Sequence, residues 1–146
     1  MTPQRVTLIT LGVADLARAR AFYAALGWRE HDQSQDEVAF FQMHGAVLGL
    51  FSLEALAEDQ GRPRAALGTG AVALAQNFST TAEVDAAYEA ALAAGGTRLK
   101  DPEEVLWGGY SGYWADPDGH VWEVAMNPFW PLGDDGSLTL PDTGGD

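Results

Sequence analysis

The sequence predicts an α+β fold in which one short pattern of elements occurs twice along the chain. Each half opens with an apolar strand-like run that leads into a helical pattern. Each helical pattern stops at glycine and is followed by further strand-like runs. With 146 residues, 47% of them hydrophobic, the chain can bury one ordinary core. We therefore expect a single domain, residues 1–146, made of two βαβββ modules.

The first module is expected over about residues 5–52. The run 6–13 is β-branched and apolar, which is typical of a buried strand. Asp15 is a candidate N-cap for a helix over 16–26, whose apolar residues recur at spacings of three and four before Gly27 ends it.

The rest of the first module reads as three further strands. A short run around 28–31 comes first, followed by a polar turn over 32–37. Two apolar runs, 38–43 and 46–51, are separated by a His44-Gly45 turn, which predicts a hairpin.

Residues 53–69 are expected to link the modules, with one helical turn possible around 54–58. The second module, 70–127, begins with a strand over 70–76 and an alanine-rich helix over 84–94. Thr80 or Thr81 is the expected helix cap.

Three strands complete the second module, at 97–100, 110–115 and 121–126, the last two joined by a tight Asp-Pro-Asp-Gly turn. The tail, 128–146, is rich in proline, glycine and aspartate and predicts irregular structure. Its Phe129-Trp130-Pro131-Leu132 segment is apolar enough to fold back onto the body.

Composition excludes several classes of function. The chain has no cysteine, which removes disulfides, thiolate nucleophiles and cysteine-bound zinc and leaves a cytoplasmic location as the expectation. A formal net charge of −13 disfavours nucleic acid and anionic membranes as partners. We interpret the acidic charge as a solvated surface; attraction of cationic ligands is the alternative.

Two motifs narrow the fold. The segment Leu11-Gly12-Val13-Ala14-Asp15-Leu16, followed by Phe22-Tyr23 and Leu26-Gly27-Trp28, resembles the opening of vicinal oxygen chelate domains, the glyoxalase, bleomycin-resistance and dioxygenase superfamily. Asp116-Pro117-Asp118-Gly119-His120 with Trp122-Glu123 resembles the closing hairpin of the same family. The resemblance covers about residues 5–127.

This resemblance implies two modules whose curved mixed sheets face each other around a cavity, with the helices on the outside. It also implies a homodimer. Metal-dependent members place four ligands in that cavity, and the matching positions here are Leu8, Gly49, Ala71 and Glu123. Only Glu123 can bind a metal, and a slip by one residue would bring in only Thr7 or Thr10. We therefore expect neither a metal nor another cofactor.

Glu123 is the one matching position with chemistry to offer, and three roles are open for it. A carboxylate in an apolar pocket suits general acid or base catalysis. It also suits binding of a cationic or hydroxyl group. The alternative is a former ligand that is now only hydrogen-bonded to a neighbour or to water.

An aromatic, glycine-rich segment over 107–114 is the second candidate feature. Its rings supply flat apolar area and its glycines permit close approach of the backbone to a ligand. We expect ligand contacts from Trp107, Tyr110 and Tyr113. Four further residues could complete the pocket, although residues of these types in such positions are more often core than ligand contacts: Phe40 (or Phe41), Phe51, Gln76 and Asn77.

These observations predict a metal-independent protein that binds a small aromatic or cationic molecule. The rival hypothesis is an enzyme of the same superfamily, a lyase, isomerase or dioxygenase, that uses Glu123. A structural or regulatory module that binds nothing is the third. No phosphate-binding loop, Ser-His-Asp arrangement or basic aromatic stripe supports any other class.

Overall fold

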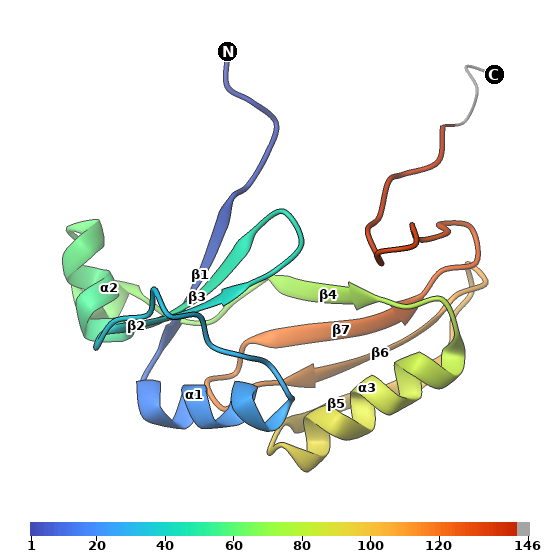
Figure 1. Ribbon diagram of the computed structural model, residues 1–146. Helices are drawn as coiled ribbons and strands as arrows, with labels where there is room; N and C mark the ends of the chain where they lie inside the picture. The colour runs from blue at the N-terminus through green and yellow to red at the C-terminus, as the bar shows by residue number, and fades with distance from the viewer. Residues whose placement is uncertain (143–146) are drawn as a thin grey trace. The chain divides into compact units, whose positions relative to one another are not determined.

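The computed structural model describes residues 1–142, so the last four residues of the predicted irregular tail lie outside the described residues. The chain divides into two compact units (Figure 1). Unit one contains Met1–Ala71 and also Pro117–His120. Unit two contains Val72–Asp116 and the chain from Val121 onward. In the described part of the chain the strands form one three-stranded and one four-stranded sheet, which confirms the predicted α+β class.

Unit one is built on the three-stranded sheet. Its elements are β1 (Leu8–Val13), α1 (Leu16–Ala25), β2 (Val38–Gln42) and β3 (Val47–Ser52). The strand order is β1-β3-β2, with β1 parallel and β2 antiparallel to β3. The crossover from β1 to a parallel neighbour needs a covering helix, and α1 supplies it.

Helix α1 begins as predicted, because the Asp15 side chain accepts a hydrogen bond from the Arg18 amide. Its inner face buries Ala19, Phe22 and Tyr23. The Tyr23 ring stacks on Trp28 at 5.3 Å between centroids and lies 6.1 Å from the ring of Phe41. This aromatic cluster is the centre of the unit-one core.

The predicted strand around residues 28–31 is absent, and this part of the prediction was wrong. Trp28 is held by the helix end instead, since its amide donates to the Tyr23 carbonyl. Arg20 anchors the segment that follows α1. Its guanidinium pairs with the Glu30 carboxylate at 3.1 Å and donates a hydrogen bond to the Gln35 carbonyl at 2.6 Å. Within residues 1–71 the first module is therefore βαββ followed by a second helix.

That second helix lies in the predicted linker and is longer than the single turn expected. Helix α2 spans Leu53–Gln60 and a short 3-10 helix, η1, spans Arg64–Ala66. The Ser52 hydroxyl caps α2 by accepting from the Ala55 amide. A Cβ added at Gly12 would lie 2.6 Å from Cδ2 of Leu53, so the missing side chain of Gly12 lets α2 pack closely on β1.

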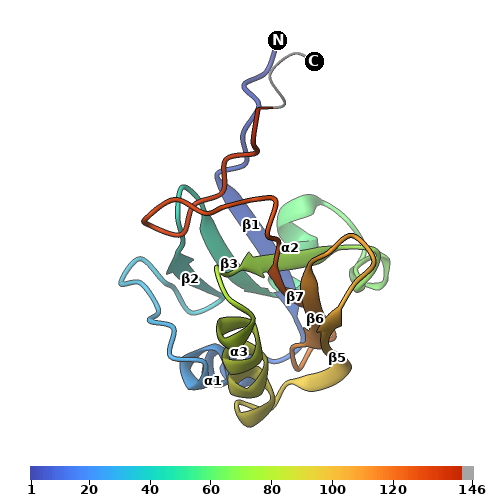
Figure 2. The ribbon, with the colours of Figure 1, turned by 90° about the vertical axis from the view of Figure 1, so that its right-hand side faces the viewer.

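Unit two is built on the four-stranded sheet. Its elements are β4 (Ala73–Asn77), α3 (Thr81–Ala93), β5 (Thr97–Glu104), β6 (Tyr110–Ala115) and β7 (Val121–Met126). The order is β4-β7-β6-β5, with β4 parallel to β7 and the other pairs antiparallel. Helix α3 lies along one face of this sheet (Figures 1 and 2).

The α3 side of the sheet carries the core of unit two. Trp114 and Trp122 are opposite each other on β6 and β7, and their rings stack at 5.7 Å. Val84, Tyr88 and Ala91 are the residues that α3 buries. Thr80 is the cap, as one of the two predicted threonines.

Strand β5 is longer than predicted and irregular. Its pairing with β6 shifts register twice, between Arg98 and Lys100 and between Lys100 and Glu103. It also contains Pro102, which is tolerated here because the strand is at the sheet edge and Pro102 lies within a register shift. The bulges decide which β5 side chains share a face with β6.

The β6–β7 turn completes unit one. Asp118 Oδ1 accepts hydrogen bonds from the Ala14 amide at 2.8 Å and from Arg18 Nη2 at 3.0 Å. His120 Nε2 lies 2.7 Å from the Gly12 carbonyl oxygen. The two sequence motifs that carry the family resemblance therefore contact each other directly.

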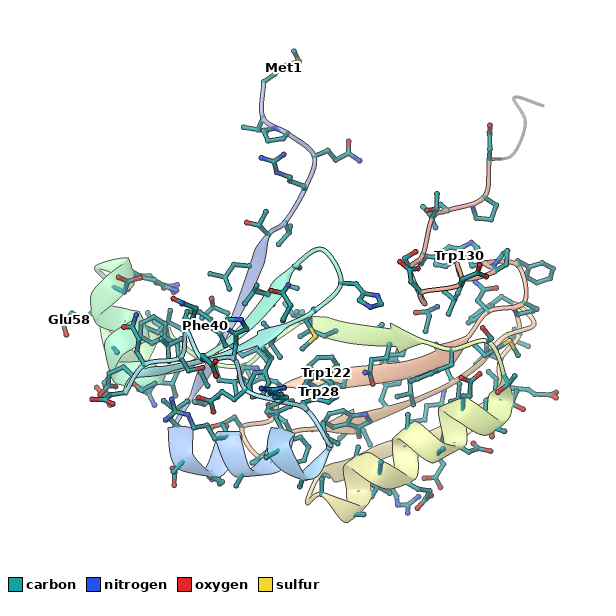
Figure 3. All side chains as sticks on the ribbon, viewed as in Figure 1. Met1, Trp28, Phe40, Glu58, Trp122 and Trp130 are labelled. Atoms are coloured by element: carbon teal, nitrogen blue, oxygen red, sulfur yellow. The ribbon has the colours of Figure 1, made fainter. Side chains whose placement is uncertain are left out.

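The tail packs in part. A Cβ added at Gly108 would lie 3.3 Å from the Phe129 ring, and Leu132 pairs with Leu138 in an isolated bridge. Figure 3 shows Trp130 on the segment that follows β7. In residues 1–142 no helix has the length and apolar character needed to cross a membrane.

Candidate functional site

The candidate site lies on the face of the four-stranded sheet that points away from α3. Two contacts identify the α3 face: the Tyr110 hydroxyl donates to Asp85 on α3 at 2.7 Å, and Arg98 lies 5.7 Å over the ring of Tyr88. Side chains alternate along a strand, so Tyr113, three residues after Tyr110, points the other way. Its partner across β7 is Glu123, which shares that face.

Glu123 and Tyr113 form the centre of this face. They are opposite each other in the antiparallel β6–β7 pair, and the Tyr113 hydroxyl donates a hydrogen bond to the Glu123 carboxylate. Burial raises the pKa of Tyr113, and the charge and hydrogen bond of Glu123 raise that pKa further because they favour the neutral phenol. The pair therefore joins an acceptor and a proton-bearing donor at one point of the sheet.

The row continues to both edges of the sheet. Ala75 on β4 is the neighbour of Glu123, and Lys100 on β5 is the neighbour of Tyr113. The positive charge of Lys100 acts to lower the pKa of Tyr113. This row therefore consists of Ala75, Glu123, Tyr113 and Lys100, one residue from each of the four strands.

A second row lies next to the first. It consists of Asn77, Ala125, Ser111 and Glu103, paired across the same four strands. Ser111 and Ala125 are buried. Lys100 and Glu103 join the two rows at the β5 edge through an ion pair of 3.1 Å. Of the small residues in the two rows, only Ala75 is exposed, beside Glu123 on β4.

Trp107 lies at the end of this face, in the loop between β5 and β6. A Cβ added at Gly109 would fall 1.8 Å from the Trp107 ring, so the ring covers this glycine. Gly109 alternates with Ser111 and Tyr113, and the Val105 amide donates to its carbonyl as a continuation of the ladder. The Trp107 ring therefore covers the Glu123 side of the chain, and the residue is 48% exposed.

The structure brings together only part of the predicted set. Glu123, Tyr113, Asn77 and Trp107 share one face of unit two. Tyr110 and Gln76 alternate to the α3 face, where Tyr110 is engaged by Asp85 and Gln76 pairs with Val124.

Phe40 and Phe51 belong to unit one. Phe40 is opposite Gly49, and its ring lies 3.4 Å from where a Gly49 Cβ would be, on the sheet face away from α1. Phe51 shares that face, since its partner Val38 is two residues from Phe40. The alternative Phe41 is core, 2% exposed and beside Tyr23.

The chelate positions offer no donor set. Leu8 and Gly49 carry no side-chain donor, and Ala71 precedes β4 in an exposed bend. Among residues 1–142, no three His, Asp or Glu side chains lie close enough together to hold a metal ion. His31 Nδ1 accepts from the Gln33 amide and His120 contacts Gly12, so both are engaged locally.

Sequence reasoning missed Lys100 and Ser111. Lys100 lies in a short, polar edge strand, and the bulges of β5 decide its facing, which no sequence period reveals. Ser111 could have been found, because it alternates with Tyr113 and so must share its face.

Comparison with known proteins agrees with this fold. A family model described as the Glyoxalase/Bleomycin resistance protein/Dioxygenase superfamily matches residues 5–124. The crystal structure of a glyoxalase-related enzyme from Fulvimarina pelagi is 40% identical, with a TM-score of 0.87 over 96% of this chain and 100% of that one.

More distant structures share the fold. A glyoxalase/bleomycin resistance protein/dioxygenase from Nocardioides is 26% identical, with a TM-score of 0.73 over 86% of this chain and 85% of that one. Lactoylglutathione lyase from Agrobacterium tumefaciens is 23% identical, with a TM-score of 0.66 over 90% of this chain and 100% of that one. No curated protein matches the chain. The chain belongs to the Glyoxalase/Bleomycin resistance protein/Dioxygenase superfamily.

Proposed function

We propose that this protein binds a small aromatic or cationic molecule without a metal, on the unit-two face that carries Glu123. The observation that supports this most is the Glu123–Tyr113 pair, a carboxylate oriented by a phenol on the adjacent strand, with exposed Ala75 beside Glu123. An ionised carboxylate has about four acceptor positions, so the phenol leaves room for an N–H or O–H of a ligand.

Aromatic contact is the second part of the proposal. The Trp107 ring and the Tyr113 ring lie on the same side of β6, one at the loop and one at the centre of the strand. Flat rings of this kind pack against an aromatic ligand, and a cation can bind over the face of the ring. Asn77 adds an amide at the β4 edge.

Metal independence is inferred from the donor set, because Leu8, Gly49 and Ala71 cannot coordinate an ion and Glu123 alone is too few ligands. The test is metal analysis of protein purified without chelator or tag metal, with a thermal shift against nickel, zinc, manganese and iron(II). A stoichiometric metal or clear stabilisation by one would overturn this part of the proposal.

The binding test uses benzylamine, an aromatic cation, measured by calorimetry. Glu123→Gln should weaken binding about tenfold, because a charge-assisted hydrogen bond is replaced by a neutral one. Glu104→Gln is the matched control, since Glu104 pairs with Tyr110 on the α3 side of the sheet. Equal affinities of the wild type and Glu123→Gln would contradict the assignment of Glu123.

A second candidate function is an enzyme reaction of lyase, isomerase or dioxygenase type. The same pair favours it, because Glu123 could take a proton from a bound substrate while the Tyr113 hydroxyl stays protonated and orients the carboxylate. Formation of lactoylglutathione from methylglyoxal and glutathione, followed by absorbance with and without added metal, tests one such reaction. Turnover that Glu123→Gln abolishes would establish the enzyme.

We also infer a cytoplasmic homodimer. The location rests on the absence of cysteine and the dimer on family membership. Light scattering coupled to size exclusion should give twice the chain mass of 15.6 kDa; a monomer would contradict the dimer.

A further inference from the structure

We propose that the ligand of this face is a zwitterion, whose cationic group pairs with Glu123 and whose anionic group pairs with Lys100. The inference rests on the proposed function, because it assigns a ligand class to the same site.

The first step is the placement of two opposite charges in one row. Glu123, Tyr113 and Lys100 lie on adjacent strands β7, β6 and β5 and are paired in register. Neighbouring strands are about 4.8 Å apart, so the attachment points of the two charged side chains are about 10 Å apart. A ligand that touches both must carry charges separated by several bonds, not adjacent ones as in an α-amino acid.

The second step is that Lys100 can exchange its present partner. Its ion pair with Glu103 spans 3.1 Å, but 52% of the Lys100 side chain and 60% of the Glu103 side chain are exposed. Exposed pairs of this kind contribute little and are screened by salt. A carboxylate of a ligand lying over Tyr113 would therefore compete for the ammonium with little cost.

The third step is electrostatic. With a net charge of −13, the protein repels a purely anionic ligand at long range. A purely cationic ligand at Glu123 would meet the like charge of Lys100 one strand beyond Tyr113. A neutral ligand with one charge of each sign avoids both penalties.

The fourth step concerns shape. Ala75, beside Glu123 on β4, is exposed and rises little above the sheet, whereas Ser111 and Ala125 are buried. A flat spacer can therefore lie over the Tyr113 ring, between Glu123 and Lys100. The ligand class is therefore a rigid or aromatic spacer with an amine at one end and a carboxylate at the other.

The experiment measures three probes by calorimetry at low salt: 4-(aminomethyl)benzoate, benzylamine and benzoate. The expected order is 4-(aminomethyl)benzoate about threefold tighter than benzylamine, with benzoate weakest. Phenylalanine, whose charges are adjacent, should bind no better than benzylamine.

The decisive variant is Lys100→Met, which keeps an unbranched side chain one atom shorter and removes its charge. The ratio of the affinities of 4-(aminomethyl)benzoate and benzylamine should fall from about three to about one, because only the zwitterion uses Lys100. Arg29→Met removes the same charge from the exposed segment between α1 and β2 and should leave the ratio at its wild-type value. Circular dichroism confirms that each variant is folded.

Two failures are distinguishable. A wild-type ratio near one, or a ratio that Lys100→Met leaves unchanged, overturns the zwitterion while the proposed function stands if Glu123→Gln still weakens benzylamine. If Glu123→Gln weakens neither amine, the proposed function fails as well. Absence of any binding of 4-(aminomethyl)benzoate to the wild type also overturns the inference.

Discussion

The Asp118 carboxylate accepts a hydrogen bond from the backbone amide of Ala14, at 2.8 Å, although 104 residues separate the two in sequence. The same oxygen binds Arg18 at 3.0 Å, and only 5% of the Asp118 side chain is exposed. The turn that resembles the closing hairpin of the family is thereby joined to the loop that resembles its opening. Each motif thus supplies half of one structural contact.

Asp118→Ala should lower the free energy of unfolding by about 2–3 kcal/mol, because it leaves an amide and a guanidinium without this acceptor. Urea unfolding followed by tryptophan fluorescence measures the change. Asp118→Asn should lose less, since the amide oxygen still accepts from Ala14. Asp36→Ala, in an exposed turn, is the control, and a loss as large there would contradict the specific role of Asp118.

Gly112→Ala should be destabilising by about 2 kcal/mol, because overpacking against backbone cannot relax by a rotamer change. An added Cβ would lie 2.8 Å from the Lys100 carbonyl oxygen and 2.7 Å from the Pro102 nitrogen. Since these atoms belong to the bulged part of β5, the variant should also reduce the discrimination by Lys100 between zwitterion and amine.

Gly70→Ala is the matched control for Gly112→Ala. Nothing lies within 4 Å of a Cβ at Gly70, so its effect should be within about 0.5 kcal/mol. Thermal unfolding compares the two variants, and equal transition midpoints would refute the close approach of β5 to β6 at Gly112.

Phenol ionisation gives a prediction for alkaline pH. The pKa values of Tyr88, Tyr110 and Tyr113 are raised above the ordinary 10.0, by burial first for Tyr88 and Tyr113 and by the hydrogen bond to Asp85 first for Tyr110. A phenol with a raised pKa when folded contributes stability that is present below pH 10.0 and is lost as the pH rises toward the folded pKa. Stability should therefore fall above pH 10.0.

The Tyr113 contribution can be isolated by absorbance at about 295 nm, where tyrosinate is detected. Glu123→Gln should shift one phenol titration to lower pH, because the negative charge that opposes ionisation is gone. Tyr113→Phe should remove that titration. An unchanged titration curve in Glu123→Gln would contradict the Tyr113–Glu123 hydrogen bond.

Trp107 should report ligand binding. Of the five tryptophans, Trp107 has its ring at the end of the Glu123 face, whereas Trp114 and Trp122 stack with each other on the α3 side. Quenching by 4-(aminomethyl)benzoate should fall by more than half in Trp107→Phe and remain in Trp130→Phe. The reverse pattern would place the ligand near the tail.

Much of the fold could be predicted because local chemistry decides it. Asp15 and Thr80 cap the helices as their side chains require, and glycine follows both helix ends. The strand predicted at 28–31 does not form, because the Trp28 ring stacks on Tyr23 within the core instead. Such a choice depends on tertiary contacts that no short window of sequence contains.

The site was predictable only in part, for a related reason. Alternation along β6 separates Tyr110 from Tyr113, yet the sequence does not say which of the two faces α3. The hydrogen bond from Tyr110 to Asp85 settles that. Lys100 could not be predicted as a site residue, because two register shifts in β5 decide which β5 side chains share a face with Tyr113.

Unit one is discontinuous, because residues 117–120 complete it after the chain has built most of unit two. A gene fragment that stops at residue 71 would encode a first half without the carboxylate that binds Ala14 and Arg18. Although the chain looks like two consecutive copies of one module, it should not divide into two independently folding halves. A split version would recover function only when the second fragment, carrying the Asp118 turn, is expressed together with the first.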